Sequence, residues 1–176
     1  MAGPPLPARL EGDGITLRLL READWPLEQA MSRDADAVRW TSIDADLDEE
    51  QARERVRRRV VRAVTGTGQR WVIESRGEPH GTVGLAVTGV RSVEVFYSLL
   101  PASRGKGLAT RAVGLVIAAA RAAGYPTIVL ATFPDNAASR ATATRCGFVE
   151  TGTRTISVKG VPQELVVWTL PADQDA

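Results

Sequence analysis

The 176-residue chain has little cysteine and histidine, with one residue of each, Cys146 and His80. A single cysteine excludes an internal disulfide and the multi-cysteine zinc and iron–sulfur sites, because these need two or more thiolates. A single histidine excludes a metal site built on a histidine pair. Excess charge is also missing, since 22 basic and 21 acidic residues give a formal net charge of +1. This balance gives no reason to expect nucleic acid or an anionic membrane as a partner.

Long apolar segments are absent as well. The longest apolar stretch, residues 113–120, is far shorter than the roughly 20 residues that span a bilayer. The first ten residues contain three prolines and no apolar region of the kind that secretory signals carry. We therefore expect a cytoplasmic protein, with residues 1–176 forming one domain whose ordered core covers about residues 12–171.

Apolar periodicity predicts an α/β fold with a mixed, mostly antiparallel sheet of six to seven strands and about four helices. Helices are expected from residue 25 toward residue 31, and over residues 48–64, 108–123 and 136–146. Strands are expected over residues 15–20, 71–75, 82–87, 93–99 and 127–131, followed by two more after Phe148. One crossover helix places a parallel strand pair in the middle of the sheet.

A glycine-rich loop, residues 104–109, lies between a predicted strand and a predicted helix. The free N–H groups and partial positive charge of a helix start favour a phosphate or pyrophosphate at this position. A Walker A loop is excluded because Lys106 is followed by Gly107. A dinucleotide loop needs a third glycine where Thr110 stands. From the loop alone, an ordinary strand–helix turn stays equally open.

The loop does not stand alone in the chain. Residues 104–109 match the pattern Arg/Gln-x-x-Gly-x-Gly/Ala at every defined position. Residues 94–101 precede it as a strand, and residues 134–139 and 146–148 follow at a matching spacing. In these segments the chain resembles the GNAT N-acetyltransferase superfamily. Residues 38–41, with the polar loop and long helix after them, resemble its RimJ/RimL-like branch. The resemblance covers about residues 15–170.

The resemblance implies a GNAT fold whose fourth and fifth strands splay apart, with acetyl-CoA bound in the cleft as co-substrate. The main-chain N–H of Leu99 would face the acetyl oxygen, and Leu100 would line the pantetheine arm. Asn136 would hydrogen-bond the pantetheine, cap its own helix, or do both. The pyrophosphate would be held by Arg104, Gly105, Lys106, Gly107, Leu108 and Ala109.

Two side chains are candidates for proton transfer, and no metal is required. Glu94 lies mid-strand among apolar residues, where it could accept the amine proton through water; the alternative is an exposed glutamate on a sheet face. The resemblance places Ser139 near the sulfur as a proton donor, whereas a first-turn serine could instead serve the local backbone. Two positions depart from the family. Ala143 stands where many relatives have tyrosine, and Phe96 stands where the branch often has glycine, which would narrow the space beside the thioester.

The resemblance implies direct acetyl transfer to a primary amine, with a protein N-terminus as the first choice of acceptor and a small amine as the second. The acidic residues between positions 34 and 50 could attract a cationic amine, or could form a solvated loop and a helix start. The arginines between positions 53 and 62 are interpreted as a solvated helix face and not as a nucleic-acid site. A non-catalytic acyl-CoA-binding module and a dinucleotide-binding oxidoreductase stay open as alternatives. A homodimer is compatible with the resemblance, although no residue predicts one.

Overall fold

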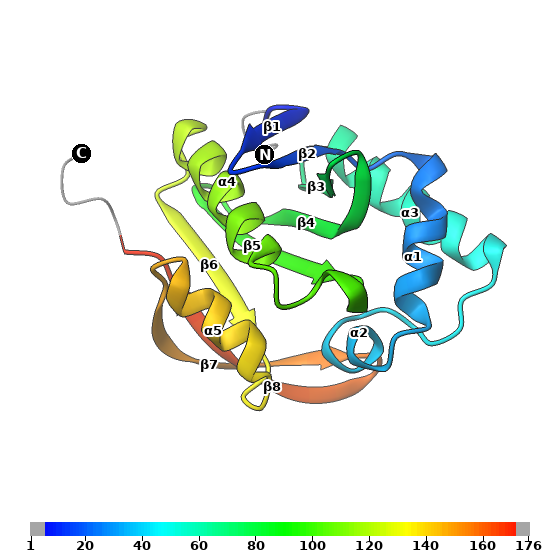
Figure 1. Cartoon of the computed structure of the whole chain (residues 1–176). Helices are drawn as coiled ribbons and strands as arrows, with labels where there is room; N and C mark the ends of the chain where they lie inside the picture. Colours follow the sequence, from blue (N-terminus) through cyan, green and yellow to red (C-terminus); the bar gives the residue numbers. More distant parts are fainter. Residues whose placement is uncertain (1–5, 172–176) are drawn as a thin grey trace.

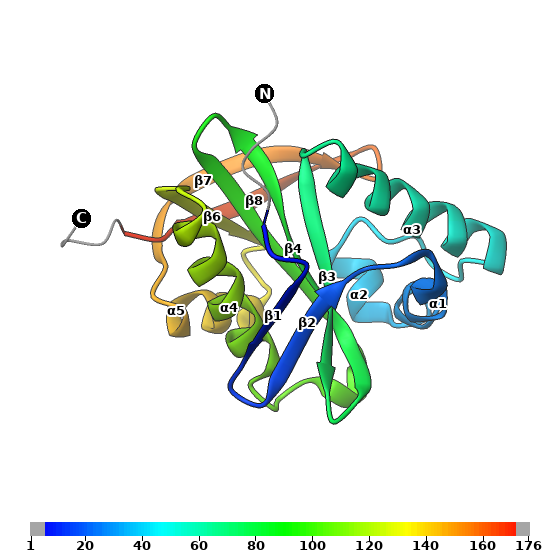
Figure 2. The same cartoon turned by 90° about the horizontal axis from the view of Figure 1, so that it is seen from above.

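The computed structural model describes residues 6–171, in which one sheet carries helices on both faces (Figures 1 and 2). The expected α/β class is confirmed. The strands are β1 (Arg9–Gly12), β2 (Ile15–Leu19), β3 (Gly68–Ser75), β4 (Glu78–Gly89), β5 (Ser92–Leu99), β6 (Thr127–Thr132), β7 (Val149–Val158) and β8 (Val161–Thr169). The α-helices are α1 (Trp25–Ser32), α2 (Ala35–Trp40), α3 (Glu49–Val64), α4 (Leu108–Ala122) and α5 (Ala137–Arg145). Residues 172–176 lie outside the described part.

The described sheet has eight strands, in the order β1-β2-β3-β4-β5-β6-β8-β7. Only β5 and β6 run parallel, and the other six neighbouring pairs are antiparallel. The expected mixed, mostly antiparallel sheet is therefore confirmed. Helix α4 forms the crossover between the two parallel strands (Figure 1).

Two short elements were not predicted, so the expected counts of strands and helices were each too low. Strand β1 has four residues and pairs with β2 through a turn at Asp13 and Gly14, which both have positive φ. It begins at Arg9, before the expected start of the core. Helix α2 has six residues and is capped by Asp34, whose side chain accepts from the N–H of Ala37. Both elements are too short to show a full apolar period.

Each face of the sheet has its own core. Helix α4 buries the predicted face, including Leu108, Ala112 and Val116, against strand residues such as Val93 and Ile128. On the other face, α1, α2 and α3 pack over β3 through the buried residues Leu27, Met31, Ala52, Val56 and Val72. Figure 2 shows α4 and α5 on one side of the sheet and α1 to α3 on the other.

The parallel strands β5 and β6 separate halfway along their length. Their pairing runs from Ser92 opposite Thr127 to Val95 opposite Leu130 and goes no further. Beyond that point β5 pairs only with β4, as far as Leu99 opposite Gly81, while β6 continues beside β8. These are the strands predicted to be fourth and fifth, so the expected splay is present. It leaves a gap in the sheet at the end of β5.

Candidate active site

The open end of β5 presents main-chain groups to the gap. The N–H of Leu100 donates to the carbonyl of His80 on β4 at 2.9 Å. Because successive residues of a strand direct their main-chain groups to opposite sides, the N–H of Leu99 points to the side that β6 has left. The carbonyl of Leu99 lies on the same side and accepts from Arg104 Nη2 at 3.1 Å. Leu99 thus directs its N–H into the gap, and its contact with an acetyl oxygen stays a prediction.

The glycine loop leads from this strand end to the start of α4. Gly105 and Gly107 have φ values of +73° and +70°, a left-handed conformation that favours glycine. A Cβ atom at either position would meet no atom within 4 Å, so these glycines serve the backbone turn and not a close approach. Gly107 is the N-cap of α4, and no side chain caps the helix. The first N–H groups of α4, from Leu108 onward, are therefore available to an anion.

The two cationic side chains of the loop, Arg104 and Lys106, have different surroundings. Arg104 forms ion pairs with Asp34 and, at 3.1 Å, with Asp36, so it ties the loop to α2. Burial opposes the charge of Asp34, but hydrogen bonds from Arg104 and from the N–H of Ala37 outweigh it and hold the pKa of Asp34 below its ordinary value. Lys106 is exposed. The loop therefore offers an anion mainly main-chain groups.

Arg111 in the first turns of α4 was missed by the sequence analysis. Its guanidinium donates to the carbonyl of Lys106 at 3.2 Å and to the carbonyl of Asp13 at 2.6 Å. It therefore joins the glycine loop to the turn between β1 and β2. A lone arginine one turn after a glycine loop gives no sequence signal of its own, because its partner lies 98 positions away.

Glu94 lies on β5 on the face covered by α3, in register with Ala86 of β4. Its Oε1 accepts from Arg154 Nη2 of β7 at 2.5 Å. The side chains of Glu94 and Arg154 are 20% and 36% exposed. Glu94 is thus a half-buried, paired carboxylate and not the isolated surface glutamate of the alternative interpretation.

Ser139 and Asn136 lie together at the start of α5 on the opposite face of the sheet. Asn136 is the N-cap, and its Oδ1 accepts from the N–H of Ser139 at 3.1 Å. The hydroxyl of Tyr97 donates to Ser139 Oγ at 3.2 Å. Because Tyr97 and Glu94 are separated by three positions on one strand, they point to opposite faces. The two predicted catalytic side chains therefore lie on different faces of the sheet, and Glu94 belongs to the part of β5 that is still paired with β6.

Tyr97 is the second residue that the sequence analysis missed. It lies in the part of β5 that is unpaired with β6. Burial raises the pKa of its hydroxyl, and hydrogen bonds with Ser139 and Thr142 only partly offset that effect. The hydroxyl therefore stays protonated at neutral pH and can supply a proton through Ser139. The position of the missing family tyrosine, Ala143, is fully buried in the same core.

Helix α2 contacts the glycine loop, the segment after β6 and the β7–β8 turn. Trp40 packs on Phe133 after β6, with ring centroids 5.4 Å apart. Arg39 pairs with Asp135 at 2.8 Å, and Lys159 of the β7–β8 turn donates to the carbonyl of Val38 at 2.7 Å. Together with the ion pairs of Arg104, these contacts connect the glycine loop, the end of β6 and the β7–β8 turn.

Most of the acidic residues between positions 34 and 50 that have described contacts cap helices or form ion pairs. Asp34 and Asp48 cap α2 and α3, and Glu49 pairs with Arg53 at 2.7 Å. Asp36 pairs with Arg104. The interpretation as a loop and helix start therefore holds for these four acids, which are not free to attract a cationic amine.

Cys146 has the surroundings of a structural thiol. Its Sγ lies 3.7 Å from the carbonyl of Thr110, and burial raises the pKa of the thiol to about 11. Since the thiolate is the nucleophilic form, this cysteine is a poor candidate for a covalent intermediate. Within residues 6–171 no group of three or more histidine, cysteine or acidic side chains is placed to hold a metal ion.

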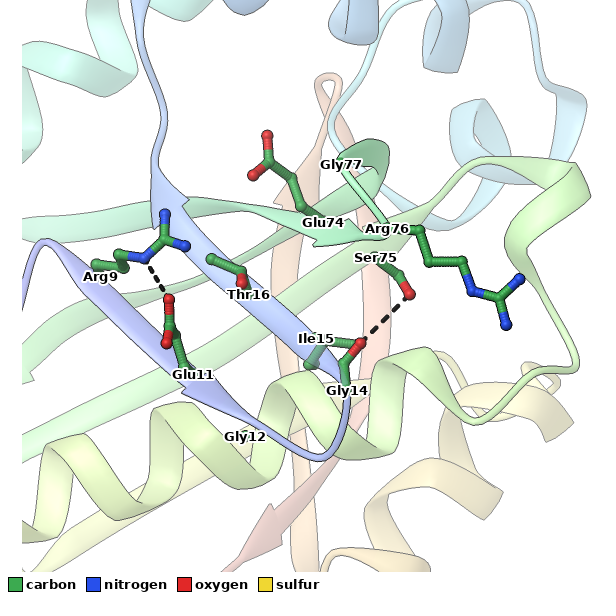
Figure 3. A pocket seen from close by; sticks show the side chains of 10 residues that line it. All are labelled: Arg9, Glu11, Gly12, Gly14, Ile15, Thr16, Glu74, Ser75, Arg76 and Gly77. Atoms are coloured by element: carbon green, nitrogen blue, oxygen red, sulfur yellow. Dashed lines mark hydrogen bonds and ion pairs between the residues drawn. The ribbon is translucent and has the colours of Figure 1, made fainter.

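One cavity, about 400 Å³, lies at the far edge of the sheet (Figure 3). Its described lining comes from β1, β2, the end of β3 and the turns beside them. Arg9 pairs with Glu11 at 2.5 Å, and Ser75 Oγ donates to the carbonyl of Gly14 at 3.3 Å, as the dashed lines show. No residue of the gap or of the glycine loop lines it, so this cavity is not part of the candidate site.

A second cavity, about 240 Å³, lies between α3 and the sheet, with Phe96 in its lining. A Cβ atom on Gly84 of β4 would lie 2.6 Å from the Phe96 ring, and the guanidinium of Arg70 lies 4.6 Å from the ring centre. The ring therefore leans over β4, away from β6. That Phe96 narrows the space beside the thioester stays a prediction.

The family model for the acetyltransferase (GNAT) domain matches residues 15–149. The chain belongs to the GNAT acetyltransferase family. The expected acetyl-CoA-dependent acetyltransferase is thus confirmed at the level of the family, with acetyl-CoA as co-substrate. No curated protein matches the chain in sequence. None of the helices in residues 6–171 has the length and apolar character needed to cross a membrane.

Solved structures share this GNAT fold at low sequence identity. A probable GNAT acetyltransferase from Chromobacterium violaceum has a TM-score of 0.84 and 23% identity, over 97% of this chain and 90% of that one. An acetyl transferase from Salmonella typhimurium, which modifies the N-terminal serine of 50S ribosomal subunit protein L7/L12, has a TM-score of 0.80 and 18% identity, over 96% and 99% of the two chains. The microcin C7 self-immunity acetyltransferase MccE, solved with acetyl-CoA and AMP, has a TM-score of 0.80 and 18% identity, over 90% and 92%.

Proposed function

We propose that this GNAT protein transfers the acetyl group of acetyl-CoA directly to a primary amine, with a protein N-terminal α-amine as the first choice of acceptor and a small amine as the second. The observation that carries the proposal is the open end of β5, where the N–H of Leu99 faces the gap. The uncapped start of α4 follows it after eight residues. A thioester carbonyl and a diphosphate need these two kinds of donor.

The cofactor-binding assignments follow from this geometry. The main-chain groups from Gly105 to Ala109 bind the diphosphate. The exposed side chain of Lys106 adds a positive charge beside it. Leu100 lines the path between the loop and the gap. Arg104 acts indirectly, because its guanidinium holds the loop to α2 through Asp34.

The proposed chemical step uses side chains from both faces of the sheet, with Glu94 on one face and Ser139 with Tyr97 on the other. Glu94 accepts the amine proton, through water, as the nitrogen bonds to the carbonyl carbon. Leu99 stabilises the negative charge that develops on the carbonyl oxygen. Ser139 donates its proton to the departing sulfur as the carbon–sulfur bond breaks, Tyr97 replaces that proton, and Tyr97 regains a proton from solvent as Glu94 releases one. Asn136 orients Ser139 by capping α5. Ser139 and Tyr97 together thus take the role of proton donor that a tyrosine at position 143 has in many relatives.

Two observations favour a protein N-terminus as the acceptor: the pKa of an α-amine and the activities of the structural neighbours. An α-amine has a reference pKa near 8, whereas a lysine amine has one near 10.4, so the α-amine loses its proton more readily. Several structural neighbours are ribosomal-protein N-terminal acetyltransferases. These similarities also support placement in the RimJ/RimL-like branch and a cytoplasmic location.

The test is release of the free CoA thiol when the purified protein is mixed with acetyl-CoA and a panel of peptides and small amines. We expect turnover with peptides that have a free N-terminus and none with the same peptides N-acetylated. Tight acetyl-CoA binding without turnover of any amine would favour the acyl-CoA-binding module instead. The alanine at position 143 is the feature that suggests this second candidate.

A further inference from the structure

The cavity between α3 and the sheet is lined by five arginines, and we call it the arginine pocket. Four of them lie on α3, at relative positions 0, 3, 4 and 7, and therefore share one helix face. The fifth comes from β3. They are Arg55, Arg58, Arg59, Arg62 and Arg70. The expected solvated face is wrong for Arg55 and Arg59, whose side chains are only 14% and 15% exposed.

The protein supplies too little negative charge for this pocket. One carboxylate, Glu28, is fully buried beneath it and pairs with Arg55 at 3.2 Å and with Arg59, while Arg70 lies 3.9 Å away. Arg58 has only a 3.8 Å contact with Glu54 at the rim.

Other charges near the pocket do not correct this imbalance. Asp44 interacts with Arg55 at longer range. Among residues 6–171, Arg62 has no carboxylate partner. Five cations thus surround one buried carboxylate and two peripheral ones.

Burial first, and repulsion between the arginines second, disfavour the charged form of the buried members. Burial, together with the nearby charges of Arg55 and Arg62, lowers the pKa of Arg70 to about 9. Burial also lowers the pKa of Arg59 well below its ordinary value, again helped by neighbouring arginines. An anion in the pocket would relieve this repulsion and strengthen its own binding, because charge interactions are strong where water is excluded.

The arginine pocket lies on the face of the sheet that carries Glu94. Arg70, Gly84 and Phe96 form one cross-strand row over β3, β4 and β5, and the next row ends at Glu94. Phe96, which lines the pocket, is three residues from Leu99. At a rise of about 3.4 Å per residue, this separation is roughly 10 Å along β5. One acceptor can therefore reach both the pocket and the gap.

We infer that the arginine pocket binds an anionic group of the acceptor, a carboxylate or phosphate carried roughly 10 Å from the reacting amine. The inference rests on the proposed function, because it places a second group of the same acceptor. For a protein N-terminus, the group is an acidic or phosphorylated side chain near the third residue. The acceptor is thus selected by its negative charge, in contrast to the expected attraction of a cationic amine by acidic residues.

The first experiment compares tetrapeptide amides of the form Ser-Ala-X-Ala, in which X is Asp, phosphoserine, Asn or Lys. We expect kcat/KM for Asp or phosphoserine to exceed that for Asn by about 10-fold, as charge-assisted hydrogen bonds give, with Lys the poorest. Whether Asp or phosphoserine is preferred identifies the anion. Equal kcat/KM for all four peptides would overturn the inference.

The second experiment locates the selectivity in the pocket. Arg62→Gln removes a cation that has no carboxylate partner, and we expect it to reduce the preference for the anionic peptide by about 3-fold or more; Arg58→Gln combined with it should remove most of the preference. Arg57→Gln is the matched control, because Arg57 lies on the same helix but pairs with Glu54 at 2.9 Å and does not line the pocket. An unchanged preference in the double variant would refute the assignment.

A third measurement separates this inference from the proposed function. N-acetylated Ser-Ala-Asp-Ala amide cannot be an acceptor, so its binding to the CoA-saturated protein, measured by calorimetry, needs no turnover. We expect the double variant to weaken this binding by about 10-fold, and the Arg57 control to leave it unchanged. Such a result supports the pocket even if no amine is acetylated. Equal affinity in the wild type and the double variant counts against the pocket even if acetylation occurs.

Discussion

Glu94 provides the sharpest test of the mechanism, because its carboxylate has both a catalytic and a structural explanation. The structural one is the ion pair with Arg154 at 2.5 Å. The two explanations separate in a pair of variants. Glu94→Gln removes the base and the ion pair, while Arg154→Gln removes the ion pair and keeps the carboxylate.

The expected size of the effect follows from the acceptor. An α-amine with a reference pKa near 8 is only about 10% neutral at pH 7, so a general base is most valuable there. General base catalysis contributes about 10²-fold to 10⁴-fold. We expect Glu94→Gln to lower kcat/KM about 100-fold at pH 7, with a smaller defect near pH 9.5, where the amine is already neutral. Arg154→Gln should keep activity within about 3-fold, because the base remains.

The assay is CoA thiol release from pH 6.5 to 9.5, with acetyl-CoA affinity measured separately. That affinity should be unchanged in both variants, because the cofactor contacts lie at Leu99 and the glycine loop. An ion pair of this exposure contributes up to about 1 kcal/mol, so both variants should melt within roughly 4 °C of the wild type. A Glu94→Gln enzyme that matches the wild type at every pH would refute the role of Glu94 as the base.

Three further predictions concern the cofactor loop, the proton donor and the thiol. Gly107→Ala places a side chain at φ +70°, which costs about 1 kcal/mol or more, and it should raise KM for acetyl-CoA. The control is Gly114→Ala in the middle of α4, where a Cβ atom also has space, and it should leave this KM unchanged. Ser139→Ala should lower kcat by less than about 10-fold, and full activity would assign the donor role to water. Cys146, with a pKa of about 11, should react with iodoacetamide at pH 8 roughly 100-fold more slowly than in the urea-unfolded chain.

The sign of the Cys146 effect on stability is also defined. The folded pKa lies above the unfolded value, so the folded state favours the neutral thiol. The contribution of the neutral thiol to folding stability is fully present below the unfolded pKa, and it is lost as the pH rises toward about 11. Unfolding midpoints of wild type and Cys146→Ser should therefore respond differently to pH between about 9 and 11. Parallel pH profiles would contradict the assigned environment.

The sequence by itself determined the features that depend on neighbours in the chain. The glycine loop, the helix start at Leu108 and the Asn136 cap follow from local backbone preferences, and the predicted strands follow from alternation. The family resemblance rests on the same local segments. This is why the class of fold and the cofactor could be predicted, whereas β1 and α2 were too short for their periods to show.

Tertiary structure alone decided which distant residues meet. Glu94 and Arg154 are 60 positions apart, and Tyr97 and Ser139 are 42 apart. Such contacts depend on strand order and helix packing, because burial of the whole core sets them and no local pattern encodes them. The same arrangement turned a stripe of arginines on α3 into the lining of a pocket. A helix face in a sequence looks equally solvated whether or not a sheet lies opposite it.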